Sequence, residues 1–397
     1  MTQNSFNRRD WLRTSLLSAG GALALPHLSF ASSANYTVTL DADKNAIYSP
    51  FFKEYLPELP WDDSALKAKL NANENPYGPS PKALEAVKAH AAGGNRYAWK
   101  ELFALIEKIA VYEGVEADNI IMGPGSSDLL EKFGMLSFLN KGNVVSADPA
   151  YMSLIRVAEA MGAQWKGVPL KKDWSHDLEA MEKAIDADTK LVYICNPNNP
   201  TGTITEAQAL RDFCSRVSEK VPVFVDEAYL DFLEDGKSQS MVDLVAQGKN
   251  IIVARTFSKI YGMAGLRVGY AVAPKDTISK VQNITRGGMG ISLPTVYGAI
   301  EAMDDAVFID QSRKLNAQSR DYVYSVLKEM KIDYVPSHTS FIIFPIELEG
   351  KDFLNKMRAE NVGVRAFEFM DQNWCRVSMG TLEEMELFAS ALKKVLV

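Results

Sequence analysis

Short runs of apolar and β-branched residues recur through the middle of the chain, and they show little alternation between apolar and polar positions. Strands that are covered on both faces of a sheet have this pattern. Helical segments separate most of the runs, which favours a mostly parallel sheet. The last two predicted strands form either a parallel or an antiparallel pair. The predicted strands are 119–123, 143–147, 164–170, 191–195, 221–225, 251–254 and 268–272.

The pattern changes after residue 290, and a chain of 397 residues is too long for one small core. We therefore predict a large domain at 81–290 and a small α+β domain at 291–397. Residues 35–80 are expected to form an irregular, extended arm that packs with the small domain or with a partner subunit. The elements predicted for the small domain are a broken helical stretch at 295–330, strands at 340–344, 362–365 and 375–378, a helix at 351–360 and a terminal helix from Leu382.

Helices in the first half of the large domain are predicted at 82–92, 99–114 and 126–139. A cluster of Asn, Pro and Gly precedes the first of them and indicates turns. Ser80 is suited to cap this helix, and Pro81 is suited to its first position because that position needs no backbone donor.

The N-terminus has the composition of an export signal. Arg8 and Arg9 precede a short apolar run and then small residues, which is typical of a secretory signal peptide at 1–34. The paired arginines resemble the twin-arginine export signal, and Ala31 and Ala34 are both possible cleavage positions. We expect a periplasmic or exported protein without a membrane anchor after cleavage; an uncleaved anchor or a cytoplasmic protein is the alternative.

Composition excludes several other classes. A net charge of −7 argues against nucleic-acid partners and anionic membranes. The three cysteines, Cys195, Cys214 and Cys375, lack the spacing of metal ligands or of a disulfide framework, so buried thiols are expected. With four histidines in the chain, no metal site is predicted.

Lys259 lies just beyond the predicted strand 251–254, in the sequence Arg255-Thr-Phe-Ser-Lys259. A lysine at the end of a buried strand is partly desolvated, which lowers its pKa and makes the neutral, nucleophilic amine accessible. The hydroxyls around it and Arg267 suit a phosphate. On its own the segment fits either a Schiff-base lysine or a solvated lysine at a strand end.

Three further motifs follow predicted strands, where open α/β sheets bind their ligands. Gly123-Pro-Gly-Ser-Ser-Asp128 is suited to bind an anion at a helix start, or is only a helix cap. Cys195-Asn-Pro-Asn-Asn-Pro-Thr-Gly202 offers amides to a phenolate oxygen, or is a rigid loop. Asp226 is suited to pair with a protonated pyridine nitrogen, or caps a helix. Together with Lys259, these motifs match the functional groups of pyridoxal 5′-phosphate.

These motifs, in this order and spacing, resemble those of the fold-type I, class I/II pyridoxal-phosphate aminotransferases, and most closely the histidinol-phosphate aminotransferase branch. The match includes Asn73–Pro81 and Ala264–Tyr270 and extends over nearly all of the chain after the leader. The resemblance implies an α/β fold with a mostly parallel seven-stranded sheet in the large domain. It also implies a homodimer with shared active sites.

The resemblance also implies roles for the residues that match its motifs. Lys259 is expected to bind the cofactor covalently and later to move a proton, and Asp226 to pair with the pyridine nitrogen. Asn199 and Tyr229 are expected to contact the ring oxygen, and Tyr151 to stack on the ring. The residues expected to hold the phosphate are Ser126, Ser127, Thr256, Ser258, Arg267 and, from the other subunit, Tyr97.

At the substrate end, the resemblance assigns Arg376 to the substrate carboxylate or its equivalent and Arg365 to a second anion of the substrate. Trp61 stands where family members that use histidinol phosphate usually have tyrosine. Two further departures are Ser340 in place of asparagine and Phe344-Pro345 in place of an arginine. These differences leave the donor open.

We therefore predict a pyridoxal-phosphate-dependent aminotransferase with a ping-pong mechanism. The donor is expected to be histidinol-phosphate-like or aromatic, and the acceptor a 2-oxo acid such as 2-oxoglutarate. A decarboxylase resembling threonine-phosphate decarboxylase is the nearest alternative. An exported, non-catalytic binding protein is another, although intact Lys259 and Asp226 argue against it.

Overall fold

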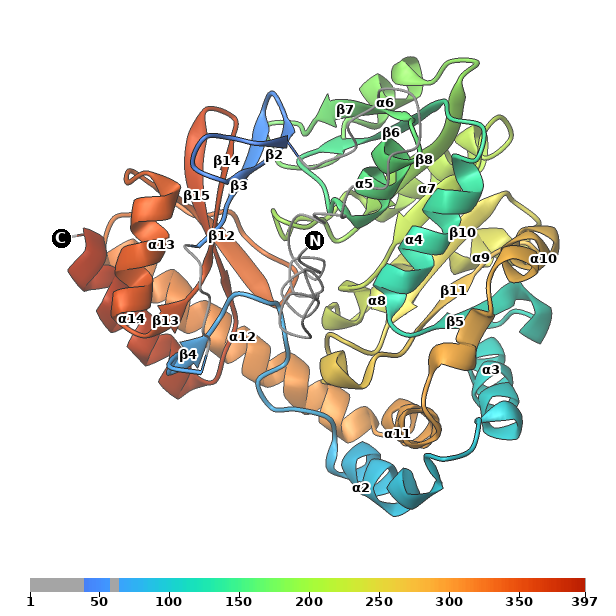
Figure 1. Ribbon diagram of the computed structural model, residues 1–397. Coiled ribbons are helices and arrows are strands. Elements are labelled where there is room, and N and C mark those ends of the chain that lie inside the picture. Colours follow the sequence, from blue (N-terminus) through green and yellow to red (C-terminus); the bar gives the residue numbers. More distant parts are fainter. Residues whose placement is uncertain (1–38, 58–63, 397) are drawn as a thin grey trace, which may run out of the picture.

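The computed structural model describes residues 39–57 and 64–396 (Figure 1). The predicted signal peptide at 1–34, with both candidate cleavage positions, and Trp61 lie outside the described residues. Two sheets of different size form the two halves of the molecule, as Figure 1 shows.

The large sheet has seven strands in the order β5-β11-β10-β9-β8-β6-β7. All neighbouring pairs are parallel except those of β11, which runs antiparallel to β10 and β5. The mostly parallel, seven-stranded sheet expected from the sequence is thus confirmed. The strands are β5 (Ile120–Gly123), β6 (Asn143–Asp148), β7 (Gln164–Pro169), β8 (Thr189–Cys195), β9 (Val223–Asp226), β10 (Ile251–Thr256) and β11 (Gly269–Val272).

Both faces of this sheet are buried, which explains the absence of alternation in the sequence. Along β8, Leu191 and Tyr193 belong to the core under α4 and α5, whereas Val192 and Ile194 belong to the core under α7 and α9. The helices of this half are α2 (Pro81–His90), α3 (Trp99–Glu113), α4 (Ser126–Ser137), α5 (Ser153–Ala160), α6 (Leu178–Ala184), α7 (Ala207–Val217), α8 (Gly236–Gln239), α9 (Val242–Ala246) and α10 (Lys275–Ile284).

The small sheet has six strands in the order β1-β2-β3-β14-β15-β12, and all its pairs are antiparallel. Its first three strands come from the segment that we expected to be irregular, so that expectation was wrong. β3 pairs with β14, β2 pairs with β3 and β1 pairs with β2, and a sequence pattern does not reveal such distant partners. The strands are β1 (Thr39–Leu40), β2 (Ala46–Ser49), β3 (Phe52–Tyr55), β12 (Phe341–Ile346), β14 (Arg365–Phe369) and β15 (Gln372–Ser378).

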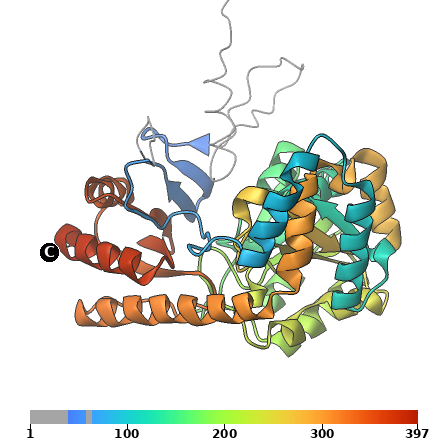
Figure 2. The same cartoon turned by 90° about the horizontal axis from the view of Figure 1, so that it is seen from below.

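The predicted helical stretch at 295–330 is two helices, α11 (Leu293–Met303) and α12 (Ala306–Glu329), with Asp305 capping the second. Helix α11 packs against α2 and α3 beside the large sheet. Figure 2 shows α12 running from there along the small half. The remaining elements are α13 (Gly350–Ala359), α14 (Leu382–Leu396) and a two-stranded parallel sheet of β4 (Ala68–Lys69) and β13 (Val362–Gly363).

The three cysteines are buried free thiols, as expected. Within residues 39–57 and 64–396, no helix has the length and apolar character needed to cross a bilayer. In the same ranges no group of three or more His, Cys, Asp and Glu side chains is placed to hold a metal ion.

A buried ion cluster lies at the ends of the central strands. The Arg255 side chain is 2% exposed and lies 3.3 Å from carboxylate oxygens of Glu227 and Asp231 and 3.6 Å from one of Glu113. Glu227 also accepts hydrogen bonds from Ser240 and from the amide of Met241. Because Glu227 follows β9 directly, the cluster fixes the strand end that carries Asp226.

Replacing Arg255 with alanine should therefore lower the free energy of unfolding by about 3–5 kcal/mol, because it leaves buried carboxylates without their counter-charge. Urea unfolding measures this change. The matched control is Lys393→Ala, which removes the half-exposed pair with Glu329 and should cost less than about 1 kcal/mol. Equal losses in the two variants would contradict a structural role for the cluster.

Candidate active site

The candidate site lies where β8, β9 and β10 end side by side. Asp226 is the last residue of β9 and pairs in register with Cys195 of β8 and Ala254 of β10. Asn199 follows β8 and Lys259 follows β10. The parallel strands thus bring three residues that are distant in sequence to one edge of the sheet, as predicted.

Lys259 faces the centre of this edge. Its Nζ donates a hydrogen bond to the backbone carbonyl of Asn73 at 3.2 Å and lies 5.5 Å from the ring centre of Tyr229. Burial lowers the pKa of Lys259 to about 8, and the positive charge of Arg376 contributes to this lowering. A substantial fraction of the amine is therefore neutral near physiological pH, as a nucleophile requires.

This pKa predicts how the apoprotein takes up a reactive aldehyde such as pyridoxal 5′-phosphate. The uptake rate should increase about tenfold per pH unit below the pKa and level off above it, because only the neutral amine attacks. Stopped-flow absorbance measures this rate. Arg376→Gln should move the midpoint to higher pH, since it removes the neighbouring positive charge. The surface control Arg216→Gln should leave the midpoint in place, and equal midpoints in all three proteins would contradict the assignment.

Asp226 is 2% exposed and accepts hydrogen bonds from the amide of Ala228 at 3.2 Å and from the Tyr193 hydroxyl at 3.3 Å. Burial raises the pKa of Asp226 to about 6, and the two hydrogen bonds oppose this change. No guanidinium or ammonium group pairs directly with Asp226 within the described residues. A protonated pyridine nitrogen would supply the missing positive charge.

The start of α4 forms an anion cradle. The N-cap of this helix is Gly125, and its φ of 90° favours glycine. Because glycine has no side chain to cap the helix, the backbone amides of the first turn remain available to an anion. A Cβ at Gly125 would overlap the guanidinium of Arg267. Arg267 in turn donates hydrogen bonds to Ser258 Oγ at 3.3 Å and to the Ala264 carbonyl at 2.9 Å. Backbone amides and a guanidinium thus converge where a phosphate would bind.

Arg376 closes the site from the small sheet. It is 5% exposed, and its Nη1 donates to Asn199 Oδ1 at 2.7 Å. The guanidinium packs 5.2 and 5.3 Å from the ring centres of Phe341 and Phe367. Burial lowers the pKa of Arg376 to about 10, and the charge of Arg365 adds to this effect. Its Nε has no partner within the described residues, so the group can accept an anionic substrate.

Most of the residues predicted for the cofactor lie at this edge. Tyr151 lies within electrostatic reach of Asp226, and Thr256 accepts a hydrogen bond from the amide of Ser258. The exception is Tyr97, which is 73% exposed and contacts Trp99 instead. Its assignment to the other subunit stays a prediction.

Two residues of the site were given no role from the sequence. Asn73 donates from Nδ2 to the Tyr229 hydroxyl at 2.9 Å and accepts from Ser378 at 2.8 Å. Asn73 lies in the motif at 73–81 that matches the family, so the sequence did mark this segment as part of the site. Tyr193, which donates to Asp226, lies inside a uniformly apolar strand, and nothing in that pattern distinguishes it from a core residue.

Residues 66–392 match the family model "Aminotransferase class I and II". The chain is similar to a histidinol-phosphate aminotransferase of Moorella thermoacetica, with 34% identity across 90% of this chain and 94% of that protein. A second relative, histidinol-phosphate aminotransferase 2 of Pseudomonas aeruginosa, is 36% identical across 86% of this chain and 95% of its own length.

Solved structures agree with this result. The crystal structure of histidinol-phosphate aminotransferase from Sinorhizobium meliloti in complex with pyridoxal-5′-phosphate has a TM-score of 0.78 and 27% identity. The alignment covers 83% of this chain and 91% of that chain. The buried lysine, the unpaired buried carboxylate and the anion cradle described above fit this cofactor. The chain belongs to the aminotransferase class I and II family and is a pyridoxal-phosphate-dependent aminotransferase.

Proposed function

We propose that this aminotransferase moves the amino group of a donor anchored by Arg376 to a 2-oxo acid in a ping-pong cycle. The observation that carries the proposal is the buried guanidinium of Arg376, whose Nε has no hydrogen-bond partner within the described residues and whose charge acts on Lys259. The names of the relatives and the aromatic rings around Arg376 support a histidinol-phosphate-like or aromatic donor.

When bound, pyridoxal 5′-phosphate supplies an electron sink for the charge that develops at the donor Cα. Lys259 would hold the cofactor and would move the proton at the donor Cα. Asp226 would keep the pyridine nitrogen protonated. Asn199 Oδ1 accepts the hydrogen bond of Arg376, so its Nδ2 would be available to donate to the ring oxygen. Tyr229, whose hydroxyl accepts a hydrogen bond from Asn73, would donate to the same oxygen.

A donor panel tests this proposal. Purified holoenzyme is incubated with histidinol phosphate, aromatic, aliphatic and acidic amino acids, each with pyruvate, oxaloacetate or 2-oxoglutarate. Formation of the matching amino acid from the acceptor is the expected result. Release of carbon dioxide without amino transfer would instead identify a decarboxylase. No turnover with any donor, together with no change in cofactor absorbance, would contradict the proposal.

We also infer a homodimer in which Tyr97 of each subunit completes the site of the other. Tyr97, Trp99 and Phe103 are exposed aromatic residues at the start of α3, which supports an interface there. Mixing Lys259→Ala chains with Tyr97→Phe chains should restore activity, because each mixed dimer contains one intact site. Activity no higher than that of the better parent would exclude shared sites.

We also propose that the protein is exported, because Arg8 and Arg9 precede a short apolar run as in twin-arginine signals. Cell fractionation should find shortened protein in the periplasm, and the double variant Arg8→Lys, Arg9→Lys should keep it full-length in the cytoplasm. Mature protein confined to the cytoplasm in both cases would exclude export.

A further inference from the structure

Two arginines lie side by side on the face of the small sheet that is turned toward the large one. Arg365 of β14 is paired in register with Arg376 of β15. Phe367 and Trp374, which share this face, belong to the core of the large half, whereas Ala366 and Cys375 on the opposite face belong to the core under α13 and α14. Two adjacent guanidinium groups, of which Arg376 acts electrostatically on Lys259, would form a site for two negative charges.

Glu54 cancels one of these charges. It lies on β3 opposite Phe367, and therefore on the same face, and its Oε1 accepts from Arg365 Nη1 at 2.5 Å. The Glu54 side chain is 6% exposed, and its other oxygen accepts a hydrogen bond from the Tyr48 hydroxyl. Thus a buried carboxylate of the same chain neutralises Arg365.

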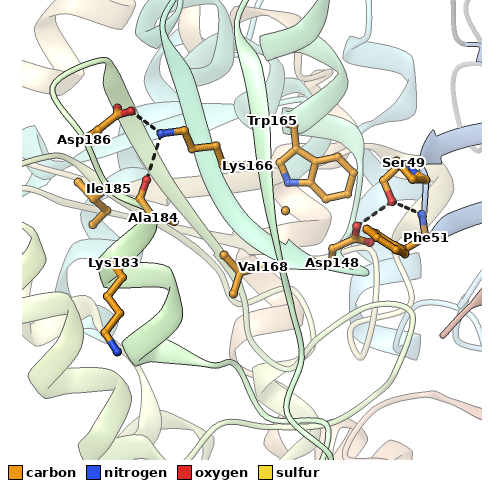
Figure 3. A pocket seen from close by; sticks show the side chains of 12 residues that line it. Ser49, Phe51, Asp148, Trp165, Lys166, Val168, Lys183, Ala184, Ile185 and Asp186 are labelled. Carbon is orange, nitrogen blue, oxygen red and sulfur yellow. Dashed lines mark hydrogen bonds and ion pairs between the residues drawn. The ribbon is translucent and has the colours of Figure 1, made fainter.

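Contacts between the arm and the large half hold this carboxylate in place. The guanidinium of Arg156 on α5 covers the Tyr48 ring at 4.4 Å. At the tip of the β2–β3 turn, Ser49 donates to Asp148 at 2.7 Å beside a cavity of about 620 Å³, which Figure 3 shows. Because Asp148 lies three residues before Tyr151, the arm is attached close to the cofactor site.

The ion pair also lies within electrostatic reach of the reacting groups. The positive charge of Arg365 opposes the effect of burial, which raises the pKa of Tyr151. Arg365 and Glu54 act in opposite directions on the pKa of Arg376, whose net lowering comes first from burial. The ion pair of Arg365 and Glu54 therefore influences the binding of an anion by Arg376.

We propose that Glu54 is a specificity-determining residue, and that it restricts the site to substrates with one negative charge. These are α-amino and 2-oxo monocarboxylic acids with uncharged side chains, anchored on Arg376. Among the substrates expected above, this selects an aromatic donor over histidinol phosphate, and an acceptor such as pyruvate over 2-oxoglutarate. A phosphorylated or dicarboxylic substrate would have to compete with Glu54 for Arg365 and would leave a buried carboxylate unpaired. The inference rests on the proposed anchoring of donors by Arg376.

Single-turnover conversion of the holoenzyme by phenylalanine, aspartate, glutamate or histidinol phosphate tests this inference. Wild-type enzyme should favour phenylalanine over each anionic alternative by at least ~10-fold in kcat/KM. Glu54→Gln should raise the ratio of aspartate to phenylalanine turnover by at least ~10-fold, because it removes the negative charge that offsets Arg365. The control Glu368→Gln lies on the opposite face of β14, paired with Lys53, and should leave the ratio unchanged.

A measurement on wild-type enzyme avoids any dependence on folding of the variant. Competitive inhibition by 3-phenylpropionate should be stronger than inhibition by glutarate, which carries a second carboxylate. Equal or better use of aspartate or histidinol phosphate by wild type, or tighter binding of glutarate, would overturn the inference while leaving aminotransferase activity intact. Failure of every donor would instead contradict the proposed function.

Discussion

Replacing Lys259 with alanine should reduce the rate of amino transfer by at least ~10³-fold, because the variant loses both the covalent attachment of the cofactor and the base that moves the Cα proton. The measurement is the steady-state rate with the best donor of the panel.

Two controls separate chemistry from folding in this experiment. The surface substitution Lys249→Ala removes a pair with Glu219 and should leave the rate within the error of wild type. A small primary amine in the buffer should partly restore proton transfer in Lys259→Ala and should not accelerate the wild-type enzyme. Activity of the variant within about tenfold of wild type would remove Lys259 from the mechanism.

Asp226→Asn should lower the rate by at least ~10²-fold, because the amide keeps the shape of the side chain and loses its charge. Only a carboxylate favours the protonated pyridine nitrogen on which the electron sink depends. The comparison is made on kcat, at saturating cofactor, together with the absorbance of the bound cofactor.

The matched control for Asp226 is Asp243→Asn, which alters an exposed pair with Arg211. This control should retain wild-type kcat, and both variants should keep the thermal midpoint of the wild type to within a few degrees. A normal kcat in Asp226→Asn would show that the ring nitrogen does not need this carboxylate.

Much of the large sheet and the cofactor site was predictable because local chemistry determined it. Uniform apolar runs identified β8, β9 and β10, and the residues at their ends were those that the folded sheet brings together. Ser80 accepts a hydrogen bond from the Ala83 amide and Pro81 opens α2, as the rules of helix capping predict.

The features that were not predictable depend on partners far away in the sequence. The strands β2 and β3 are short. β3 pairs with β14, whose Glu368 lies 313 residues after Tyr55, and β2 pairs with β3, so no local pattern marks either strand. For the same reason Glu54 could not be matched to Arg365. Arg365 was expected to bind a substrate anion, and the structure pairs it with a carboxylate of its own chain.

The most direct test of the account is to locate the cofactor on the chain. Holoenzyme is reduced with borohydride, digested and analysed by peptide mass spectrometry. We expect a phosphopyridoxyl group on Lys259 and its loss when the enzyme is first treated with an amino donor in the absence of acceptor. Modification of a different lysine, or an unmodified Lys259 in an active preparation, would contradict the central claim.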